Sequence, residues 1–147
     1  MSIDADVLVL RLGLMRELLA DLDSVGEVDA RRLRDDRLTR HAVERILTRH
    51  AVERILTQLV DLAVSINSHV AASAGKTPSS YRESFHAAAA AGLINVDLAQ
   101  RLAPSAGLRN VLTHDYVDID LGLVAGAVTA SRRDYGEYVT AVARTLR

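Results

Sequence analysis

The sequence contains no cysteine. This absence excludes disulfides and thiolate chemistry, and it is typical of proteins of the reducing cytoplasm. No run approaches the 18 or more apolar residues needed to span a bilayer. The acidic start of the chain, Met-Ser-Ile-Asp-Ala-Asp, is unlike the basic start of a signal peptide. We therefore expect a cytoplasmic protein with no membrane partner.

Aromatic residues are also scarce, at 3% of the chain, whereas hydrophobic residues make up 49%. The core must then be built from Leu, Val, Ile and Ala, which favours helices packed on helices, because sheet cores usually contain more aromatic residues. No alternating strand pattern bounded by turns occurs. A chain of 147 residues is long enough for one domain with its own core. The prediction is an all-α, single-domain bundle of about five helices covering residues 1–147.

The charge balance gives no general sign of nucleic-acid binding. The formal net charge is −1, so any RNA site has to be a local patch. Metal-ligand spacing is absent among the histidines and acidic residues, and no phosphate-binding glycine loop occurs, so neither a metal site nor a cofactor is expected. Four histidines are interpreted as structural or exposed side chains: His41, His50, His69 and His86.

Apolar spacing and helix-ending residues divide the chain into segments. The first helix should run from Asp4 to about Asp23 and be buried on most of its surface, through Val7, Leu8, Leu10, Leu14, Leu18 and Leu22. A polar stretch, 27–36, follows as a connector or helix start. Further helices are predicted to end at Gly75 and Gly92, to begin near Asn95, and to cover 104–115 and 120–146. The last should bury Leu123, Val124, Val128, Tyr135, Tyr138, Val139 and Val142.

The second helix contains an exact duplication: Thr-Arg-His-Ala-Val-Glu-Arg-Ile-Leu occupies 39–47 and again 48–56. Nine residues advance a helix by about two and a half turns, so the two copies face opposite sides. Val52, Ile55 and Leu56 continue the apolar stripe of the downstream helix, which predicts that the second copy faces the core. The first copy either lengthens the helix and presents its apolar face to a partner, or loops out; good helix formers and no breaker favour the first alternative.

The most informative stretch is Arg109-Asn110-Val111-Leu112-Thr113-His114-Asp115-Tyr116, at the end of a predicted helix. Asn110 and His114 share a helix face, and Arg109 lies roughly 140° from His114, within reach of a long side chain. A lone arginine or helix-end histidine is more often a salt-bridge partner or a cap. Together, a guanidinium that grips phosphate and an imidazole that moves protons near neutral pH suit cleavage of a phosphodiester.

This pattern, Arg, four residues, His, any residue, Tyr, resembles the signature of the HEPN superfamily and, within it, the HepT-like toxins of bacterial toxin–antitoxin pairs. The surrounding order is also similar, with the His-Ala-Val-Glu-Arg helix, then Pro78-x-x-Tyr81, then the motif and a last helix. The resemblance implies a metal-independent endoribonuclease with Arg109 and His114 as catalytic residues, and Asn110 orienting the imidazole or the substrate.

The same resemblance implies the partners. They are RNA as substrate, a second copy of the chain in a homodimer, and an MntA-like nucleotidyltransferase antitoxin that neutralises the toxin by adding AMP to Tyr116. An added phosphate beside Arg109 would block RNA by occupancy and by like-charge repulsion. The alternative function is a non-catalytic helical interaction or nucleotide-binding module that only docks a nucleotidyltransferase.

Overall fold

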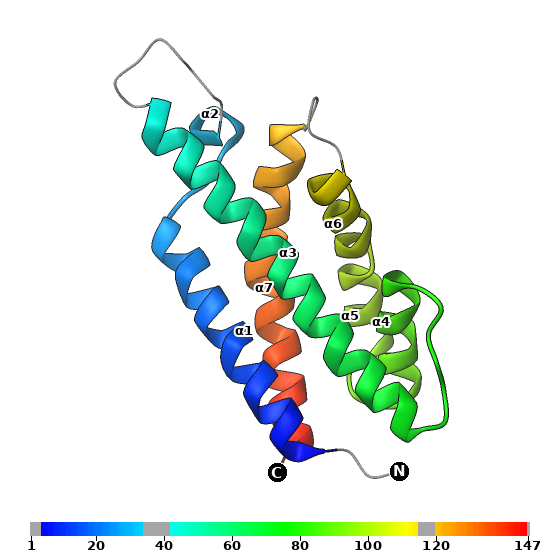
Figure 1. Ribbon diagram of the computed structural model, residues 1–147. Coiled ribbons are helices and arrows are strands. Elements are labelled where there is room, and N and C mark those ends of the chain that lie inside the picture. Colours follow the sequence, from blue (N-terminus) through cyan, green and yellow to red (C-terminus); the bar gives the residue numbers. More distant parts are fainter. Residues whose placement is uncertain (1–3, 34–41, 115–119, 147) are drawn as a thin grey trace.

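The computed structural model describes residues 4–33, 42–114 and 120–146, with the side chains of residues 42–47 and 114 outside the description. In these parts of the chain every regular element is a helix (Figure 1). The helices are α1 (Ala5–Val25), α2 (Ala30–Leu33), α3 (Ala42–Ser73), α4 (Tyr81–Ala90), α5 (Val96–Leu102), α6 (Pro104–His114) and α7 (Leu121–Thr145). The all-α prediction is confirmed. Six of these helices correspond to the segments predicted above, and the one-turn α2 lies in the polar stretch 27–36.

The helix α3 is the centre of the arrangement. It packs against α1 and α7 on one side and against α4 and α6 on the other (Figure 1). In the same view α3 descends while α6 ascends, so the two neighbouring helices are antiparallel. The C-terminal end of α6 therefore points toward the N-terminal half of α3.

Part of α3, Thr48–Ser73, is long and apolar enough to cross a bilayer by length and composition. More than half of its most apolar window, 56%, is buried inside the fold. Leu59, Ala63 and Ile66 on this helix are completely buried. Contact with five other helices, α1, α2, α4, α6 and α7, accounts for the apolar character of α3, as expected for a helix buried on most of its surface.

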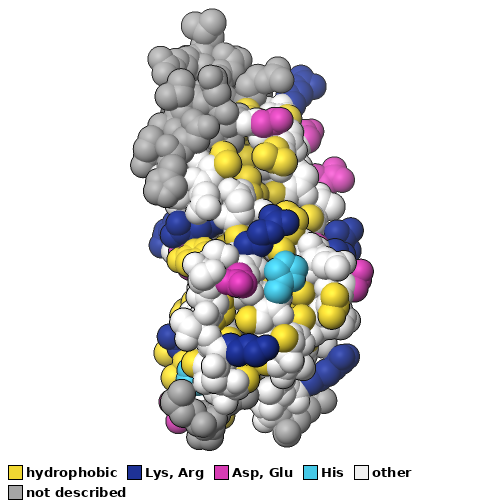
Figure 2. Space-filling model, turned by 90° about the vertical axis from the view of Figure 1, so that its right-hand side faces the viewer, with side chains coloured by type: hydrophobic (Ala, Val, Ile, Leu, Met, Phe, Trp, Pro, Cys, Tyr) yellow, Lys and Arg dark blue, Asp and Glu magenta, His cyan; other side chains and the backbone are white. Residues whose placement is uncertain are grey.

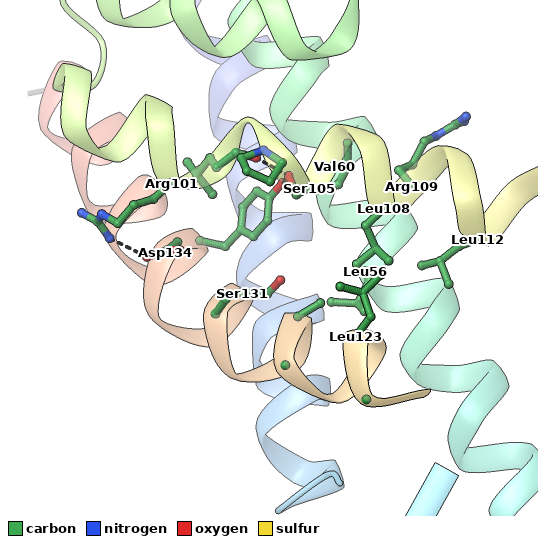
Figure 3. Close-up of a pocket in the computed structure, with 17 residues that line it drawn as sticks. Leu56, Val60, Arg101, Ser105, Leu108, Arg109, Leu112, Leu123, Ser131 and Asp134 are labelled. Atoms are coloured by element: carbon green, nitrogen blue, oxygen red, sulfur yellow. Dashed lines mark hydrogen bonds and ion pairs between the residues drawn. The ribbon is translucent and has the colours of Figure 1, made fainter. Parts of the chain in front are cut away.

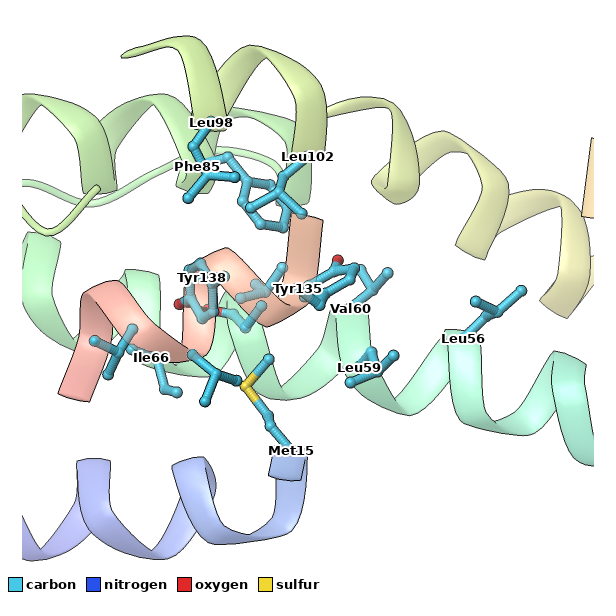
Figure 4. Packing of buried hydrophobic residues seen from close by; sticks show 14 of the residues in the cluster. Met15, Leu56, Leu59, Val60, Ile66, Phe85, Leu98, Leu102, Tyr135 and Tyr138 are labelled. Carbon is cyan, nitrogen blue, oxygen red and sulfur yellow. Dashed lines mark hydrogen bonds between the residues drawn. The ribbon is translucent and has the colours of Figure 1, made fainter. Parts of the chain in front are cut away.

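The core is mostly aliphatic, and two tyrosines of α7 stand at its centre (Figure 4). The rings of Tyr135 and Tyr138 meet edge to face, with centroids 6.2 Å apart. The Tyr138 hydroxyl donates to Asn67 Oδ1 at 2.7 Å, which satisfies a polar group buried on α3. Burial raises the pKa of the Tyr138 phenol, so this hydroxyl stays protonated and remains a donor.

Glycines end two helices, as the sequence predicts. Gly75 and Gly92 adopt φ angles of +77° and +84°, a left-handed conformation that costs glycine little. In each case the amide of the next residue closes the helix end: Lys76 N donates to Ala71 O at 2.8 Å and Leu93 N to Ala88 O at 3.0 Å. These two stops separate α3 from α4 and α4 from α5.

Three sequence expectations about burial need correction or refinement. The helix α1 is not buried on most of its surface, because Leu10 and Leu14 are 65% and 43% exposed; the buried positions are Leu8, Leu12, Met15 and Leu22. Leu123, expected in the core, is 55% exposed, whereas the next residue of the same turn, Val124, is completely buried. The polar connector 27–36 contains α2, which buries Leu33 against α3 and α7.

The duplicated segment lies in α3 from Ala42 onward. Val52, Ile55 and Leu56 of the second copy are at most 7% exposed, so the prediction that this copy faces the core is confirmed. Val43, Ile46 and Leu47 are the equivalent residues of the first copy, and their side chains lie outside the described residues. Which way the first copy faces stays a prediction.

Candidate active site on helix α6

The motif occupies the last turns of α6. The helix begins at Pro104, where proline needs no hydrogen-bonded amide, and it continues to His114. Residues 109–114 of the motif are therefore helical, as predicted. Tyr116, the predicted modification site, lies outside the described residues.

The Arg109 side chain contacts two other helices. Its Nε donates to Asp61 Oδ1 of α3 at 3.0 Å, and its guanidinium carbon lies 5.1 Å from the ring centroid of Tyr81, the first residue of α4. The guanidinium thus stacks on an aromatic face while a carboxylate holds one of its donors. Three helices that are distant in sequence converge on this one cation.

These contacts leave one edge of the guanidinium for a ligand. Arginine carries five N–H donors in a fixed fork, and Asp61 uses the single one on Nε. The four donors on the two terminal nitrogens can grip a phosphate in the bidentate manner. The Arg109 side chain is 23% exposed and that of Asp61 40%, so the ion pair is open to solvent on one side.

Asn110 and His114 lie one helical turn apart on the same face of α6. Asn110 is exposed, as a residue that contacts a substrate should be. Thr113 is satisfied within the helix, since its hydroxyl donates to Arg109 O at 3.0 Å. The direction of the His114 side chain lies outside the described residues, so its approach to Arg109 remains a prediction.

A cavity of about 330 Å³ opens on another side of α6, between α3 and the start of α7 (Figure 3). Its walls are mainly aliphatic, with Leu56, Leu108, Leu112 and Leu123 among them. At one end Arg101 is hydrogen-bonded to Asp134, so these charges neutralise each other. Figure 3 shows the Arg109 side chain directed away from this cavity. Arg109 thus takes part in the lining of the cavity, while its guanidinium lies outside it.

Asp134 is an ion-pair partner and not a second acid for catalysis. Burial by itself would raise its pKa, but hydrogen bonds from Arg133 and Arg101 outweigh burial and hold the pKa below its usual value. The carboxylate stays ionised and joins α5 to α7. Its role is structural.

The surface beside α4, α5 and α6 has no extended basic patch on its described part (Figure 2). Basic side chains are separated there by hydrophobic and uncharged surface, in line with the net charge of −1. Within the described ranges, no three His, Cys, Asp or Glu side chains are grouped so that they could hold a metal ion. His69 instead accepts a hydrogen bond from the Asp4 amide at 3.0 Å, and His86 is exposed.

Sequence reasoning missed Asp61 and Tyr81 as neighbours of Arg109. The available signal for Asp61 was its charge within the apolar run 59–64, where a lone carboxylate needs a partner. In the sequence, Tyr81 is marked only by its place in the Pro78-x-x-Tyr81 pattern. Neither signal says which of the chain's arginines is the partner.

Comparison with solved structures shows a shared all-α fold. A tri-AMPylated Shewanella oneidensis HEPN toxin in complex with MNT antitoxin superimposes with a TM-score of 0.77 at 19% identity, over 95% of this chain and 98% of that chain. The structure of a toxin–antitoxin with AMP-PNP gives the same TM-score at 18% identity and the same coverage. The bundle is therefore a HEPN-type fold.

The family follows from sequence. The family model described as "Ribonuclease HepT-like" matches residues 15–142, and the chain belongs to this family. It is 34% identical over 83 residues to the tRNA nuclease HepT of Aphanizomenon flos-aquae, covering 55% of this chain and 56% of that protein. It is 32% identical over 65 residues to the mRNA nuclease HepT of Shewanella oneidensis, covering 44% and 49%. These matches thus span about half the length of both curated relatives.

Proposed function

We propose that this protein is the toxin of a toxin–antitoxin pair and acts as a metal-independent endoribonuclease of the cytoplasm. The observation that carries the proposal is the Arg109-to-His114 motif on the last turns of α6, in a chain that belongs to the HepT-like family. The two relatives above are a tRNA nuclease and an mRNA nuclease, which supports RNA as the substrate class. Arg109, with one edge open beyond its ion pair to Asp61, is the phosphate-binding group.

The chemistry needs only protein side chains and the RNA itself. His114 takes the proton from a ribose 2′-hydroxyl, and that oxygen attacks the adjacent phosphorus. The bond from phosphorus to the 5′-oxygen of the next nucleotide breaks, and this oxygen receives the proton that His114 accepted. Arg109 stabilises the charge that builds on the phosphoryl oxygens, and Asn110 orients the imidazole or the substrate. The products carry a 2′,3′-cyclic phosphate and a 5′-hydroxyl.

The direct test is cleavage of unstructured RNA by the purified protein in excess EDTA. We expect cleavage to continue in the chelator and to leave cyclic phosphate ends, because the attacking oxygen belongs to the substrate. An RNA with a single 2′-deoxynucleotide at a mapped cleavage position should resist cutting there. Loss of all activity in EDTA, or cleavage at the deoxy position, would contradict the proposed chemistry.

Arg109→Lys should slow RNA cleavage by about 10²-fold or more. Arg109 donates a hydrogen bond to Asp61 through Nε, while the other edge of its guanidinium remains available to a phosphate. A lysine ammonium is a point charge that cannot do both with fixed geometry. The measurement is the single-turnover rate at saturating RNA, with Arg82→Lys as a matched change at an exposed position of α4. A wild-type rate for Arg109→Lys would remove Arg109 from the catalytic site.

We propose that the active form is a homodimer. The face shown in Figure 2 has no extended basic patch on its described part, and two copies of the motif lining one cleft would double the local positive charge. The partner that neutralises the toxin is an MntA-like nucleotidyltransferase. It transfers AMP from ATP to Tyr116: a bond forms between the phenol oxygen and the α-phosphorus, pyrophosphate leaves, and the phenol proton passes to solvent.

A further inference from the structure

A polar ridge runs along α3, beginning in the second copy of the duplicated segment. His50, Arg54, Gln58 and Asp61 follow one another at intervals of four, four and three residues. At about 100° per residue these positions fall within an arc of roughly 80°. His50 and Arg54 are exposed, and Gln58 is half-buried. The ridge ends at Asp61, the residue that holds Arg109.

A hollow of about 340 Å³ lies between this ridge and the motif helix. The α3 residues that line it are all polar, and Leu112 of α6 completes the wall: His50, Glu53, Arg54, Thr57, Gln58 and Leu112. Because α3 and α6 are antiparallel, moving along α6 from Arg109 toward His114 means moving back along α3 from Asp61. The hollow therefore begins one turn beyond Arg109, on the His114 side.

The charge inside the hollow is positive. The Glu53 carboxylate accepts a hydrogen bond from Arg49 Nε at 2.9 Å, which neutralises it. Within the described part of the chain, no carboxylate lies within ion-pair distance of Arg54. Arg54 thus offers an exposed guanidinium beside the hydroxyl and amide groups of Thr57 and Gln58. A guanidinium can bind an anionic group, and the hydroxyl and amide groups beside it can form hydrogen bonds with the polar atoms next to that group.

The opposite side of the same ridge is unsuited to an anion. There a second hollow lies between α3 and α1. Arg54 and Gln58 also reach this hollow, but three carboxylates line it with them: Glu17, Asp21 and Asp61. Like charges would repel a phosphate from that side. A polyanion that approaches Arg54 is therefore directed toward α6 and the motif.

We propose that the hollow between α3 and α6 is a subsite for the RNA chain next to the cleaved bond. Arg54 binds a backbone phosphate of the neighbouring nucleotide, and Gln58 and Thr57 hydrogen-bond to the same nucleotide. Packed helices lie roughly 8–10 Å apart, so a strand held at Arg109 can continue into the hollow without leaving the surface. This inference rests on the proposed ribonuclease function and assigns a binding role to the second copy of the duplication.

The test measures binding separately from cleavage. The probe is a single-stranded 2′-O-methyl RNA, which has no free 2′-hydroxyl to attack and is not consumed. Affinity is measured by fluorescence anisotropy over a series of salt concentrations for the full-length protein, Arg54→Gln and Arg144→Gln. Arg144 is exposed in the last turn of α7, so Arg144→Gln is a control with the same change of charge.

Arg54→Gln should weaken RNA binding about tenfold at moderate salt, since a hydrogen-bonded ion pair to phosphate is lost. The slope of log affinity against log salt should fall by about 0.7, the value for one phosphate contact to a single strand. The maximal single-turnover rate on unmodified RNA should stay near the wild-type value, because Arg54 does not touch the reacting atoms. Arg144→Gln should leave both slope and affinity unchanged.

Equal slopes for Arg54→Gln and Arg144→Gln would overturn the subsite, even if the wild-type protein cuts RNA as proposed. Normal RNA binding by Arg54→Gln together with lost binding of the nucleotidyltransferase would also overturn it, and would assign the hollow to the protein partner. A different result would contradict the proposed ribonuclease function, namely RNA cleavage that persists in His114→Ala. A circular dichroism melt of each variant tests separately whether it remains folded.

Discussion

His114→Ala is expected to abolish RNA cleavage and growth arrest while leaving the fold intact. Loss of a proton-transfer group typically lowers a rate by a factor of about 10² to 10⁴. The free energy of unfolding should change by no more than about 0.5 kcal/mol, because a polar residue in the last turn of a helix contributes little packing. The measurements are single-turnover cleavage, plating efficiency on induction, and a thermal melt followed by circular dichroism.

The matched control for this variant is His86→Ala. His86 is an exposed histidine in the middle of α4, so its removal also costs little packing and should leave cleavage near the wild-type rate. Full cleavage activity of His114→Ala would contradict the ribonuclease proposal. Inactivity accompanied by an early melt would instead assign His114 to the stability of α6.

Tyr116→Phe should remain toxic in cells that also express the cognate nucleotidyltransferase, whereas the wild-type toxin is neutralised there. The aromatic ring survives, so cleavage should continue, and only the hydroxyl that accepts AMP is lost. The adenylated wild-type protein should be inactive because a phosphate beside Arg109 competes with RNA for the same donors. Plating efficiency and intact mass after incubation with ATP and the antitoxin measure the two effects.

Tyr81→Phe is the control for that experiment. The phenylalanine ring can still stack on Arg109, and Tyr81 is exposed at the start of α4, so only a second surface hydroxyl is removed. This variant should cut RNA and remain sensitive to the antitoxin. If Tyr116→Phe were folded but inactive on RNA, Tyr116 would be a catalytic residue. If it still gained AMP at wild-type level, the modification site would lie elsewhere.

The contacts of Arg109 have a consequence for both experiments. Asp61 and Tyr81 hold the guanidinium before any substrate arrives, so less side-chain entropy is lost when a phosphate binds. A preorganised arginine of this kind stabilises developing charge more effectively than a mobile one. Under the proposed mechanism, an adenylate attached close to the motif should inhibit efficiently, since its phosphate would compete with RNA for these preorganised donors.

The sequence by itself determined the helical class, the main helix ends and the orientation of the second repeat copy. These features depend on near neighbours: glycines at 75 and 92 supply the left-handed residues that close α3 and α4, and Val52, Ile55 and Leu56 recur at helical spacing. The motif 109–116 was equally visible, because its residues are consecutive. The burial of α1 was predicted less well, since its apolar residues surround the helix and spacing alone does not select the packed face.

Only the tertiary structure decided which groups meet at the site. Asp61 is 48 positions from Arg109 in the chain, and Tyr81 belongs to a third helix. The hollow beside Leu112 likewise exists only because α3 and α6 pack antiparallel. Helix formation depends on backbone bonds four residues apart, whereas these neighbours depend on which faces of separate helices bury each other. The local pattern of the sequence therefore predicts where the helices form. The contacts between separate helices are known only from the packing of the whole bundle.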